Sequence, residues 1–215
     1  MSDDKRIWDL LMEAIGNPYG VAGLMGNLMA ESSMNPFCKT GGKGDIRKLS
    51  GLEYAHKVMA GDIAPYDFAH DGIAFGLAQW CYWSRKEDLF KYCRKSNLDI
   101  GSLDCQVGYL LEELPKYKTV WKTLKDATSI GEASDIVLLR YEKPANTSDK
   151  VKAKRQLYGQ QFYEMYADVP KRMTFKEMAD ILSNIERKEA AVISSKSHDS
   201  LLFVIYELET LAEEE

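Results

Sequence analysis

The sequence predicts an all-α protein, mainly helical, with room for a short β-hairpin and with a small two-helix appendage at its C-terminal end. Apolar residues recur at spacings of three and four along most of the chain, which is the periodicity of amphipathic helices. No convincing alternation of apolar and polar residues runs for a useful length, so we expect little strand structure. Stretches rich in glycine and proline interrupt the helical pattern and mark the loops.

The helices of the main domain follow one another in order. One apolar face runs from Ile7 to Ile15, and Gly16-Asn17-Pro18 ends that helix. A second helix is expected from Tyr19 to about Ser32. Residues 35–50 and the stretch around 61–66 are turn-rich and read as loops, and a short β-hairpin fits within 35–75. Later helices are expected from near 85, from 102 or 104, and over roughly 118–125, 129–142 and 148–167.

Length and charge divide the chain in the same place. The 215 residues allow one ordinary domain of about 100–200 residues and an appendage, and we place the boundary so that the domains are 1–170 and 171–215. The first domain carries 22 Lys and Arg against 23 Asp and Glu, whereas the appendage carries 6 against 10.

No basic block could follow a phosphate backbone, so nucleic acid is not an expected partner. No apolar run reaches the roughly 18 residues that span a bilayer, so we expect no stable membrane insertion.

The appendage is predicted to contain two amphipathic helices, over about 175–185 and 201–211. Two such helices cannot bury their apolar faces alone. We therefore expect them to pack on the main domain, on each other, or on another subunit in a homodimer or larger oligomer.

The cysteines and histidines argue against a metal site. Cys38, Cys81, Cys93 and Cys105 form no CxxC pair, and the chain has only three histidines. We expect no metal and no cofactor. Free thiols are favoured over two disulfides, because the polar stretch from 1 to 6 lacks the apolar run of a secretory signal.

Glu31 is the first candidate for chemistry, because it closes an otherwise apolar helix. A carboxyl group in an apolar site has a raised pKa and can keep the proton that a general acid needs. The alternative is that Glu31 is merely a polar residue at a helix end. Ser32 reads as a hydrogen-bonding neighbour that positions Glu31 or a sugar.

A second candidate segment runs from Asp71 to Arg85 and combines glycines, aromatics and an amide. Gly72 and Gly76 let a bulky ligand approach the backbone, and the Gln79 side chain can both donate to and accept from hydroxyl groups. Aromatic faces stack on sugar rings, and the candidates for that role are Phe75, Trp80 and Trp83. The alternative is that these aromatics belong to the core. A third segment, Arg140-Tyr141-Glu142-Lys143-Pro144, places a phenol beside a further carboxylate.

Together these segments resemble the phage tail lysozyme family, which is related to goose-type lysozymes and lytic transglycosylases. Glu31-Ser32-Ser33-Met34-Asn35-Pro36 is similar to the segment around the family's catalytic glutamate. Phe75-Gly76-Leu77-Ala78-Gln79-Trp80 is similar to its Gly-(Ile/Leu)-Ala-Gln-Trp motif. Leu139-Arg140-Tyr141-Glu142-Lys143-Pro144 resembles its later Tyr/Phe-Glu-Arg-Pro element, with Lys143 in place of Arg. The resemblance covers about residues 5–167 and leaves the appendage uncovered.

The resemblance implies a lysozyme-like fold and an endolysin that cleaves the β-1,4 bond between N-acetylmuramic acid and N-acetylglucosamine in peptidoglycan. Glu31 would protonate the departing oxygen, and Ser32, Asn35, Phe75, Gln79, Trp80, Trp83, Tyr141 and Glu142 would bind substrate. For the second carboxylate, Asp71 comes first, and Asp67, Asp62 and Asp45 are alternatives. His70 beside Asp71 is a further, weaker candidate for catalysis. Lytic transglycosylases use one glutamate, so hydrolysis and transglycosylation both stay open.

The resemblance also bears on location and on the competing functions. We expect synthesis in the host cytoplasm, followed by release through a holin or delivery by a virion, and we expect the appendage to serve wall targeting or oligomerisation. One competing function is a catalytically silent phage component that binds the wall. The other is a wall amidase or peptidase, which the absence of an HExxH motif and of a Cys-His framework disfavours.

Overall fold

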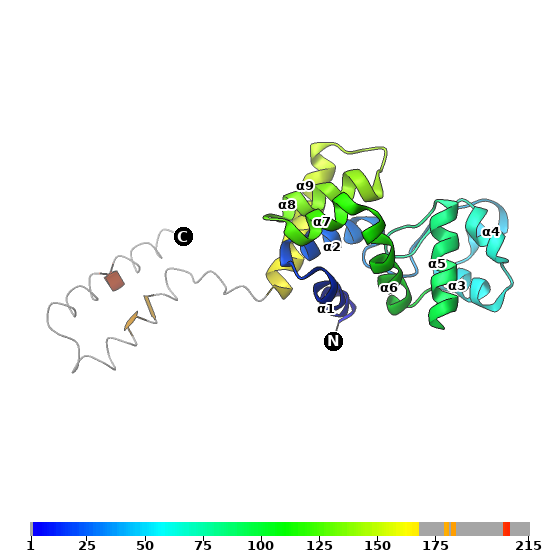
Figure 1. Ribbon diagram of the computed structural model, residues 1–215, viewed down its shortest axis with the longest axis horizontal. Coiled ribbons are helices and arrows are strands. Elements are labelled where there is room, and N and C mark those ends of the chain that lie inside the picture. Colours follow the sequence, from blue (N-terminus) through cyan, green and yellow to red (C-terminus); the bar gives the residue numbers. More distant parts are fainter. Residues whose placement is uncertain (1, 168–178, 181, 184–203, 207–215) are drawn as a thin grey trace. The chain divides into compact units, whose positions relative to one another are not determined.

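The computed structural model describes residues 2–167, 179–180, 182–183 and 204–206 (Figure 1). The chain divides into two compact units, Met1–Ala167 and Asp168–Glu215. The described residues of the second unit are helical. Most of the two predicted appendage helices lies outside the described residues, and so do the wall-targeting and oligomerisation roles predicted for them.

The first unit is mainly helical, which confirms the predicted fold class. Its α-helices are α1 (Asp3–Ile15), α2 (Pro18–Ser32), α3 (Gly51–Ala60), α4 (Pro65–His70), α5 (Trp83–Ser96), α6 (Leu103–Glu113), α7 (Lys118–Asp126), α8 (Ile130–Ile136) and α9 (Asp149–Tyr166). Short 3₁₀ turns form η1 (Gly44–Lys48) and η2 (Leu114–Lys116), and η3 (Val137–Glu142) is a π-helical turn that continues α8.

Helix α2 is the centre of this unit and packs against α1, α7, α8 and α9. Its residues 20–28 are all buried, so the helix is covered on every side. Asn17 caps its first turn by accepting from the backbone N–H of Tyr19 at 2.9 Å. At its end Ser33 and Met34 take left-handed backbone angles, with φ of 54° and 59°. The chain therefore turns away directly after Glu31 and Ser32.

The strands β1 (Lys39–Gly41) and β2 (Ile73–Phe75) pair antiparallel, with Thr40 opposite Ala74. This small sheet lies within the range predicted for a β-hairpin, but its strands are joined by η1, α3 and α4 instead of a tight turn. Helix α4 begins inside a stretch that the sequence predicts to be loop, and α3 occupies residues for which the sequence predicts no element. Figure 1 shows α3, α4 and α5 grouped on one side of α6, with α1, α2 and α7 to α9 on the other.

A disulfide joins α5 to α6 through Cys93 and Cys105, whose Cα atoms lie 5.7 Å apart. The prediction of four free thiols is wrong for this pair. Both cysteines are buried, and the short connection between two packed helices brings their side chains together. Cys38 and Cys81 are free.

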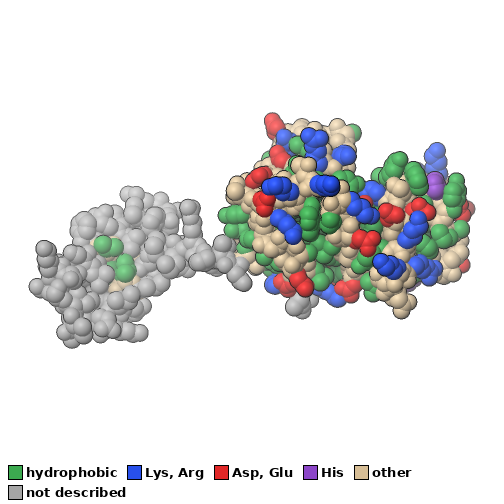
Figure 2. All heavy atoms as spheres, viewed as in Figure 1, with side chains coloured by type: hydrophobic (Ala, Val, Ile, Leu, Met, Phe, Trp, Pro, Cys, Tyr) green, Lys and Arg blue, Asp and Glu red, His purple; other side chains and the backbone are tan. Residues whose placement is uncertain are grey.

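Positive and negative side chains are interspersed on the face of the first unit shown in Figure 2. This distribution agrees with the near-neutral charge of that domain. Within the described part of the chain, no helix is long and apolar enough to cross a membrane.

Candidate active site

Glu31 lies in the last turn of α2, with its side chain 21% exposed. Arg155, on the buried face of α9, donates from Nη2 to Glu31 Oε1 at 2.7 Å. The same guanidinium donates from Nη1 to the backbone carbonyl of Asn27 at 3.3 Å. The apolar setting predicted for Glu31 is therefore wrong, because a buried cation fixes its carboxylate. The carboxylate nevertheless stays partly open to solvent, so a substrate can reach it.

Ser32 and Asn35, which follow Glu31, form hydrogen bonds around the end of α2. Ser32 is buried, and its hydroxyl donates to the carbonyl of Leu28 at 3.0 Å. Asn35 is exposed, and its Oδ1 accepts from the backbone N–H of Phe37 at 2.9 Å. The hydroxyl of Ser32 thus bonds to the helix backbone. Asn35 uses its Oδ1 within the turn, and the residue is exposed.

Glu142 ends the π-helical turn η3 and belongs to the same neighbourhood as Glu31. Burial, followed by the negative charge of Glu31, raises the pKa of Glu142 to about 8. Glu142 Oε1 is buried and has no hydrogen-bond partner among the described residues. The carboxyl group whose neutral form is favoured by its surroundings is therefore Glu142, which the sequence assigned to substrate binding.

The Gln79 side chain links residues 38–40 to the Gly76–Trp80 segment. Its backbone has a φ of 46°, and its Nε2 donates to the carbonyls of Cys38 at 3.0 Å and Gly76 at 2.9 Å. Thr40 donates its hydroxyl to Gln79 Oε1 at 3.0 Å. The amide predicted to bridge sugar hydroxyls is thus bonded within the protein. Burial and the charge of Glu31 raise the pKa of the Cys38 thiol, which places this junction beside Glu31.

A buried network around Glu113 uses two of the predicted substrate ligands. Trp80 donates from Nε1 to Glu113 at 3.0 Å, and the Tyr141 hydroxyl donates to the same carboxylate at 2.5 Å. Arg85 completes it with bonds of 2.6 Å from Nε and 2.9 Å from Nη2. Burial would raise the pKa of Glu113, but the hydrogen bonds and charge of Arg85 outweigh it and lower that pKa. Glu113 is therefore a buried, fully bonded anion.

Three of the rings predicted to bind substrate lie in the core. Trp80 is fully buried, Tyr141 is 2% exposed, and Phe75 is fully buried against the ring of Tyr54. None of these rings can stack on a sugar without unpacking the core. Both the Gly76–Trp80 motif and the Tyr141-Glu142 element are instead anchored to the core through them.

Asp71 forms a buried ion pair with Lys86 of α5. The Lys86 side chain is fully buried and the Asp71 side chain is 5% exposed, and Nζ lies 2.5 Å from Oδ1. Asp71 also accepts from the Tyr54 hydroxyl at 2.5 Å and from the backbone N–H of Ile73 at 2.8 Å. Because its oxygens are bonded inside the protein, this geometry favours a structural role for Asp71 over that of a base that activates water.

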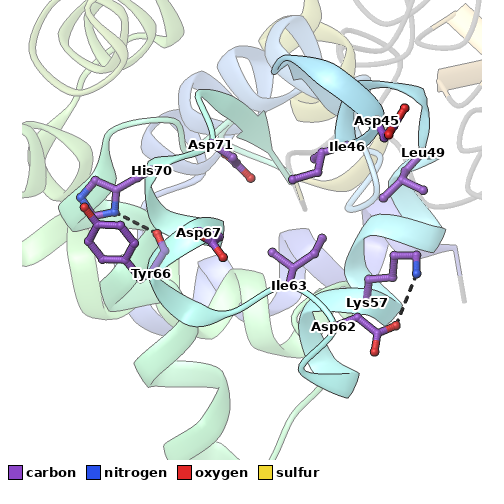
Figure 3. A pocket seen from close by; sticks show the side chains of 10 residues that line it. All are labelled: Asp45, Ile46, Leu49, Lys57, Asp62, Ile63, Tyr66, Asp67, His70 and Asp71. Carbon is purple, nitrogen blue, oxygen red and sulfur yellow. Dashed lines mark hydrogen bonds and ion pairs between the residues drawn. The ribbon is translucent and has the colours of Figure 1, made fainter.

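The four candidates for a second carboxylate are gathered at one cleft, which Figure 3 shows. Its volume is about 580 Å³, and it is lined by Asp45, Ile46, Leu49, Lys57, Asp62, Ile63, Tyr66, Asp67, His70 and Asp71. Asp45 and Asp62 pair with lysines on the surface, at 2.7 and 3.3 Å. The structure thus brings the aspartates together, but Glu31 does not belong to the lining of this cleft.

Trp83 is the one predicted sugar-stacking ring that faces solvent. It begins α5 and is 45% exposed. The ring of His70 is stacked between Trp83, with centroids 5.7 Å apart, and Tyr66, at 4.2 Å. His70 Nδ1 lies 2.9 Å from the carbonyl of Tyr66. His70 is thus held in an aromatic stack at the surface, with Nδ1 beside a backbone carbonyl.

Four functional side chains escaped the sequence interpretation: Lys86, Gln106, Glu113 and Arg155. All are buried and polar. Gln106 holds both motif segments, since its Oε1 accepts from the backbone N–H of Leu77 and its Nε2 donates to the carbonyl of Pro36, each at 2.8 Å. A Cβ atom on Gly76, which has a φ of 81°, would lie 2.6 Å from that amide. In the sequence, such a residue could be recognised as a polar residue on an otherwise apolar helical face, as with Lys86 beside Leu89 and Cys93.

Comparison with known proteins gives one match. The family model described as phage tail lysozyme matches residues 2–166, which is most of the chain. No curated protein and no solved structure matches. The matched range coincides with the first unit and includes Glu31, Gln79 and Glu142.

Proposed function

The chain belongs to the phage tail lysozyme family, and on that premise we propose that it cleaves the β-1,4 bond between N-acetylmuramic acid and N-acetylglucosamine with Glu31 as general acid. The family gives it the general role of a lysozyme-like cell-wall hydrolase that acts on peptidoglycan. The bond and the acid are the parts that we add.

The position of Glu31 carries this proposal. The Glu31 carboxylate is partly exposed and has a fixed orientation. Its orientation is fixed because α2 is buried along its length and Arg155 forms an ion pair with Oε1. A general acid must lie within hydrogen-bond reach of the atom that it protonates, and it must be held there while the bond breaks. Asp71 and Glu113 are bonded inward, whereas Glu31 borders solvent.

The exposed groups near Glu31 and on α5 are the candidates for holding the glycan. Asn35 offers its amide nitrogen at the turn after α2, and Trp83 offers a ring face on the neighbouring lobe. We assign Gln79 and Ser32 to positioning, since their side chains bond to the backbone around Glu31. Phe75, Trp80 and Tyr141 support the site from the core.

The choice between hydrolysis and transglycosylation depends on what attacks the sugar carbon. An inverting hydrolase places a second carboxylate about 6.5–9.5 Å from the acid, so that water fits between them. A transglycosylase lets a hydroxyl of the substrate attack instead. Mass spectrometry of the released muropeptides separates the two reactions, because a 1,6-anhydro end is lighter than a hydrolysed end by one water.

Clearing of purified Gram-positive cell walls tests the role of Glu31. Glu31→Gln keeps the shape of the side chain but cannot donate the proton, so we expect a loss of at least about 100-fold. Glu13→Gln is the matched control, since Glu13 is an exposed glutamate on α1. If Glu31→Gln clears walls as fast as the parent while both are folded by circular dichroism, Glu31 is not the acid.

Wall binding and the chemical ends of the released fragments decide between the competing functions. Wall binding by the parent protein without release of fragments would favour the catalytically silent component. New amino termini without new reducing ends would indicate an amidase or peptidase.

A further inference from the structure

The exposed aromatic side chains of the first unit gather at one place. Among its described residues, the rings most open to solvent are those of Tyr66, at 71%, Tyr82, at 60%, and Trp83, at 45%. Tyr66 lies in the first turn of α4, and Tyr82 and Trp83 form the start of α5, which packs against α4. Aromatic side chains usually bury most of their surface, so three of them left open on one pair of helices indicate a binding surface.

His70 joins these rings into one row. It lies one turn after Tyr66 on α4, and the two rings are stacked with centroids 4.2 Å apart and planes inclined by 21°. His70 is also stacked with Trp83, at 5.7 Å and 14°, and the ring of Tyr82 lies 5.9 Å from that of Trp83. We call these four residues the aromatic platform. Because the rings already hold one another in place, little side-chain freedom is lost when a ligand binds.

A cavity opens beside the platform. Its volume is about 350 Å³, near the lower end of the roughly 300–1,000 Å³ that is usual for small-molecule sites. It is lined by Pro65, Tyr66, Ala69, His70, Trp83 and Glu87. A ligand in this cavity therefore meets three rings of the platform. Glu87, whose Oε1 pairs with Lys91 at 3.0 Å, adds a carboxylate that can accept hydrogen bonds from hydroxyl groups.

The platform also borders the aspartate-lined cleft, since Tyr66 and His70 line both cavities. Figure 3 shows these two rings together at one rim of the cleft, with the Asp67 side chain pointing into it. Asp67 forms no hydrogen bond or ion pair with another described residue. Apart from His70 and the tyrosine, the titratable side chains that line the two cavities are Asp45, Asp62, Asp67, Asp71 and Glu87 against Lys57. This negative setting opposes a phosphate polymer or an anionic lipid surface and suits a neutral ligand with hydroxyl groups.

We propose that the aromatic platform is a carbohydrate-binding site that takes one N-acetylhexosamine ring of the peptidoglycan strand. The inference rests on the proposed function, which names that strand. A pyranose ring presents C–H groups on its face, which pack on aromatic rings, and hydroxyl groups at its rim, which need acceptors. The platform supplies the rings, and Asp67 and Glu87 supply acceptors beside them. Pro65 and Ala69 offer apolar contact to the acetamido methyl group.

This site is separate from the proposed acid. No described residue of α2, η3 or α9 lines either cavity, and Glu31 belongs to α2. The platform lies in the lobe of α3 to α5, which Figure 1 shows on the other side of α6 from α2. A strand held at the platform stays attached while Glu31 acts on another part of the wall. Such a second attachment raises the effective concentration of glycosidic bonds at Glu31.

The first test follows one signal and needs no activity. The protein is ¹⁵N-labelled Glu31→Gln, used so that the ligand is not cleaved. Its four tryptophans give four indole N–H signals, and Trp83→Phe identifies that of Trp83. With chitotetraose, a short chain of N-acetylglucosamine, we expect the Trp83 signal to move and the signals of Trp8 and Trp121, on α1 and α7, to stay. If the Trp83 signal is unmoved at about 10 mM chitotetraose, which would fill most of a site with a Kd of about 1 mM, the inference falls.

The second test is the binding of Glu31→Gln protein to purified cell walls, measured by co-sedimentation. Adding Trp83→Ala or Tyr66→Ala removes one ring of the platform, and we expect each to raise the dissociation constant about tenfold. Trp83→Phe keeps a ring and should stay within about threefold of the parent. Tyr158→Ala is the matched control, because it removes a half-buried ring from α9 and should leave wall binding unchanged.

The outcomes separate this inference from the proposed function. Unchanged wall binding in folded Trp83→Ala and Tyr66→Ala variants overturns the platform, even if Glu31→Gln is inactive. A moving Trp83 signal together with a fully active Glu31→Gln variant overturns the acid and leaves the platform standing. Binding to vesicles of uncharged phosphatidylcholine that requires Trp83, without a response to chitotetraose, assigns the platform to a lipid surface and overturns the inference. Should Trp83→Ala fail to fold, the largely exposed Tyr66 and the chitotetraose titration decide.

Discussion

Replacing Lys86 by Met tests whether Asp71 is a structural anion. The Lys86 ammonium is fully buried and bonds to Asp71 at 2.5 Å, to the Tyr54 hydroxyl at 3.0 Å and to the carbonyl of Ile73 at 3.0 Å. Methionine fills a similar volume, so the main effect of the substitution is to leave the carboxylate without its cation.

The expected loss follows from what Asp71 retains. Removing one partner of a buried ion pair costs about 3–5 kcal/mol, because an uncompensated charge stays behind. Asp71 keeps two donors, the Tyr54 hydroxyl at 2.5 Å and the backbone N–H of Ile73 at 2.8 Å. These bonds soften the penalty, so we expect the free energy of unfolding to fall by about 3 kcal/mol.

Urea unfolding followed by tryptophan fluorescence measures this difference. Lys91→Met is the control, because Lys91 pairs with Glu87 at 3.0 Å on the surface of the same helix, and it should change stability by less than about 0.5 kcal/mol. Adding Asp71→Asn to Lys86→Met should recover part of the loss. A loss below about 1 kcal/mol for Lys86→Met would refute the reasoning.

The same variants bear on catalysis. If Asp71 serves structure, Asp71→Asn should keep wall-clearing activity within about tenfold at a temperature where it is folded. A loss as large as that of Glu31→Gln, in a folded variant, would restore Asp71 as the second catalytic carboxylate.

Three further predictions concern packing, the disulfide and pH. A Cβ on Gly26 would lie 2.3 Å from a backbone carbonyl of α9, so Gly26→Ala should cost about 2–3 kcal/mol in urea unfolding. Gly131→Ala meets no atom closer than 3.6 Å and should be neutral or stabilising by up to about 1 kcal/mol. Thiol titration of the unfolded, unreduced protein should find two free cysteines, and four free thiols would contradict the disulfide. Replacing Cys93 and Cys105 together by Ala should lower the free energy of unfolding by about 3 kcal/mol. The pKa of Glu142 rises from 4.5 to about 8 on folding, so the folded state binds the extra proton and unfolding free energy should fall as pH rises between those values. The melting temperature should follow that fall in the wild type, and the fall should be smaller in Glu142→Gln.

Helices α1 and α7 could be predicted from the sequence because their apolar residues recur along one face. Helices α3 and α4 were missed, although Ser50 and Glu53 form a capping box at the start of α3. That box lies in a stretch whose glycines and prolines suggest loop. Local signals of opposite sense competed there, and the burial of Tyr54, Ala55 and Val58 stabilises the helix.

The site was predictable only in part, for a physical reason. Glu31 could be singled out as a candidate because a lone carboxylate ends an apolar helix, and Glu142 because it lies beside Tyr141 in a segment that ends at a proline. Arg155 could not be paired with Glu31, since the two are 124 residues apart and only the packing of α9 on α2 brings them together. Trp80 was misjudged because an indole suits a core and a sugar platform equally well until its neighbours are known.

Gln106 links the two ends of the segment that carries the aspartate-lined cleft. Its side chain bonds to the carbonyl of Pro36 and to the backbone N–H of Leu77, each at 2.8 Å, so the forty residues between them leave and return to α6 within the reach of one side chain. The pairing of β1 with β2 and the bonds from Gln79 to the carbonyls of Cys38 and Gly76 join the same two ends. The chain that follows Glu31 is therefore tied both to α6 and to the Gly76–Trp80 segment at the base of this lobe.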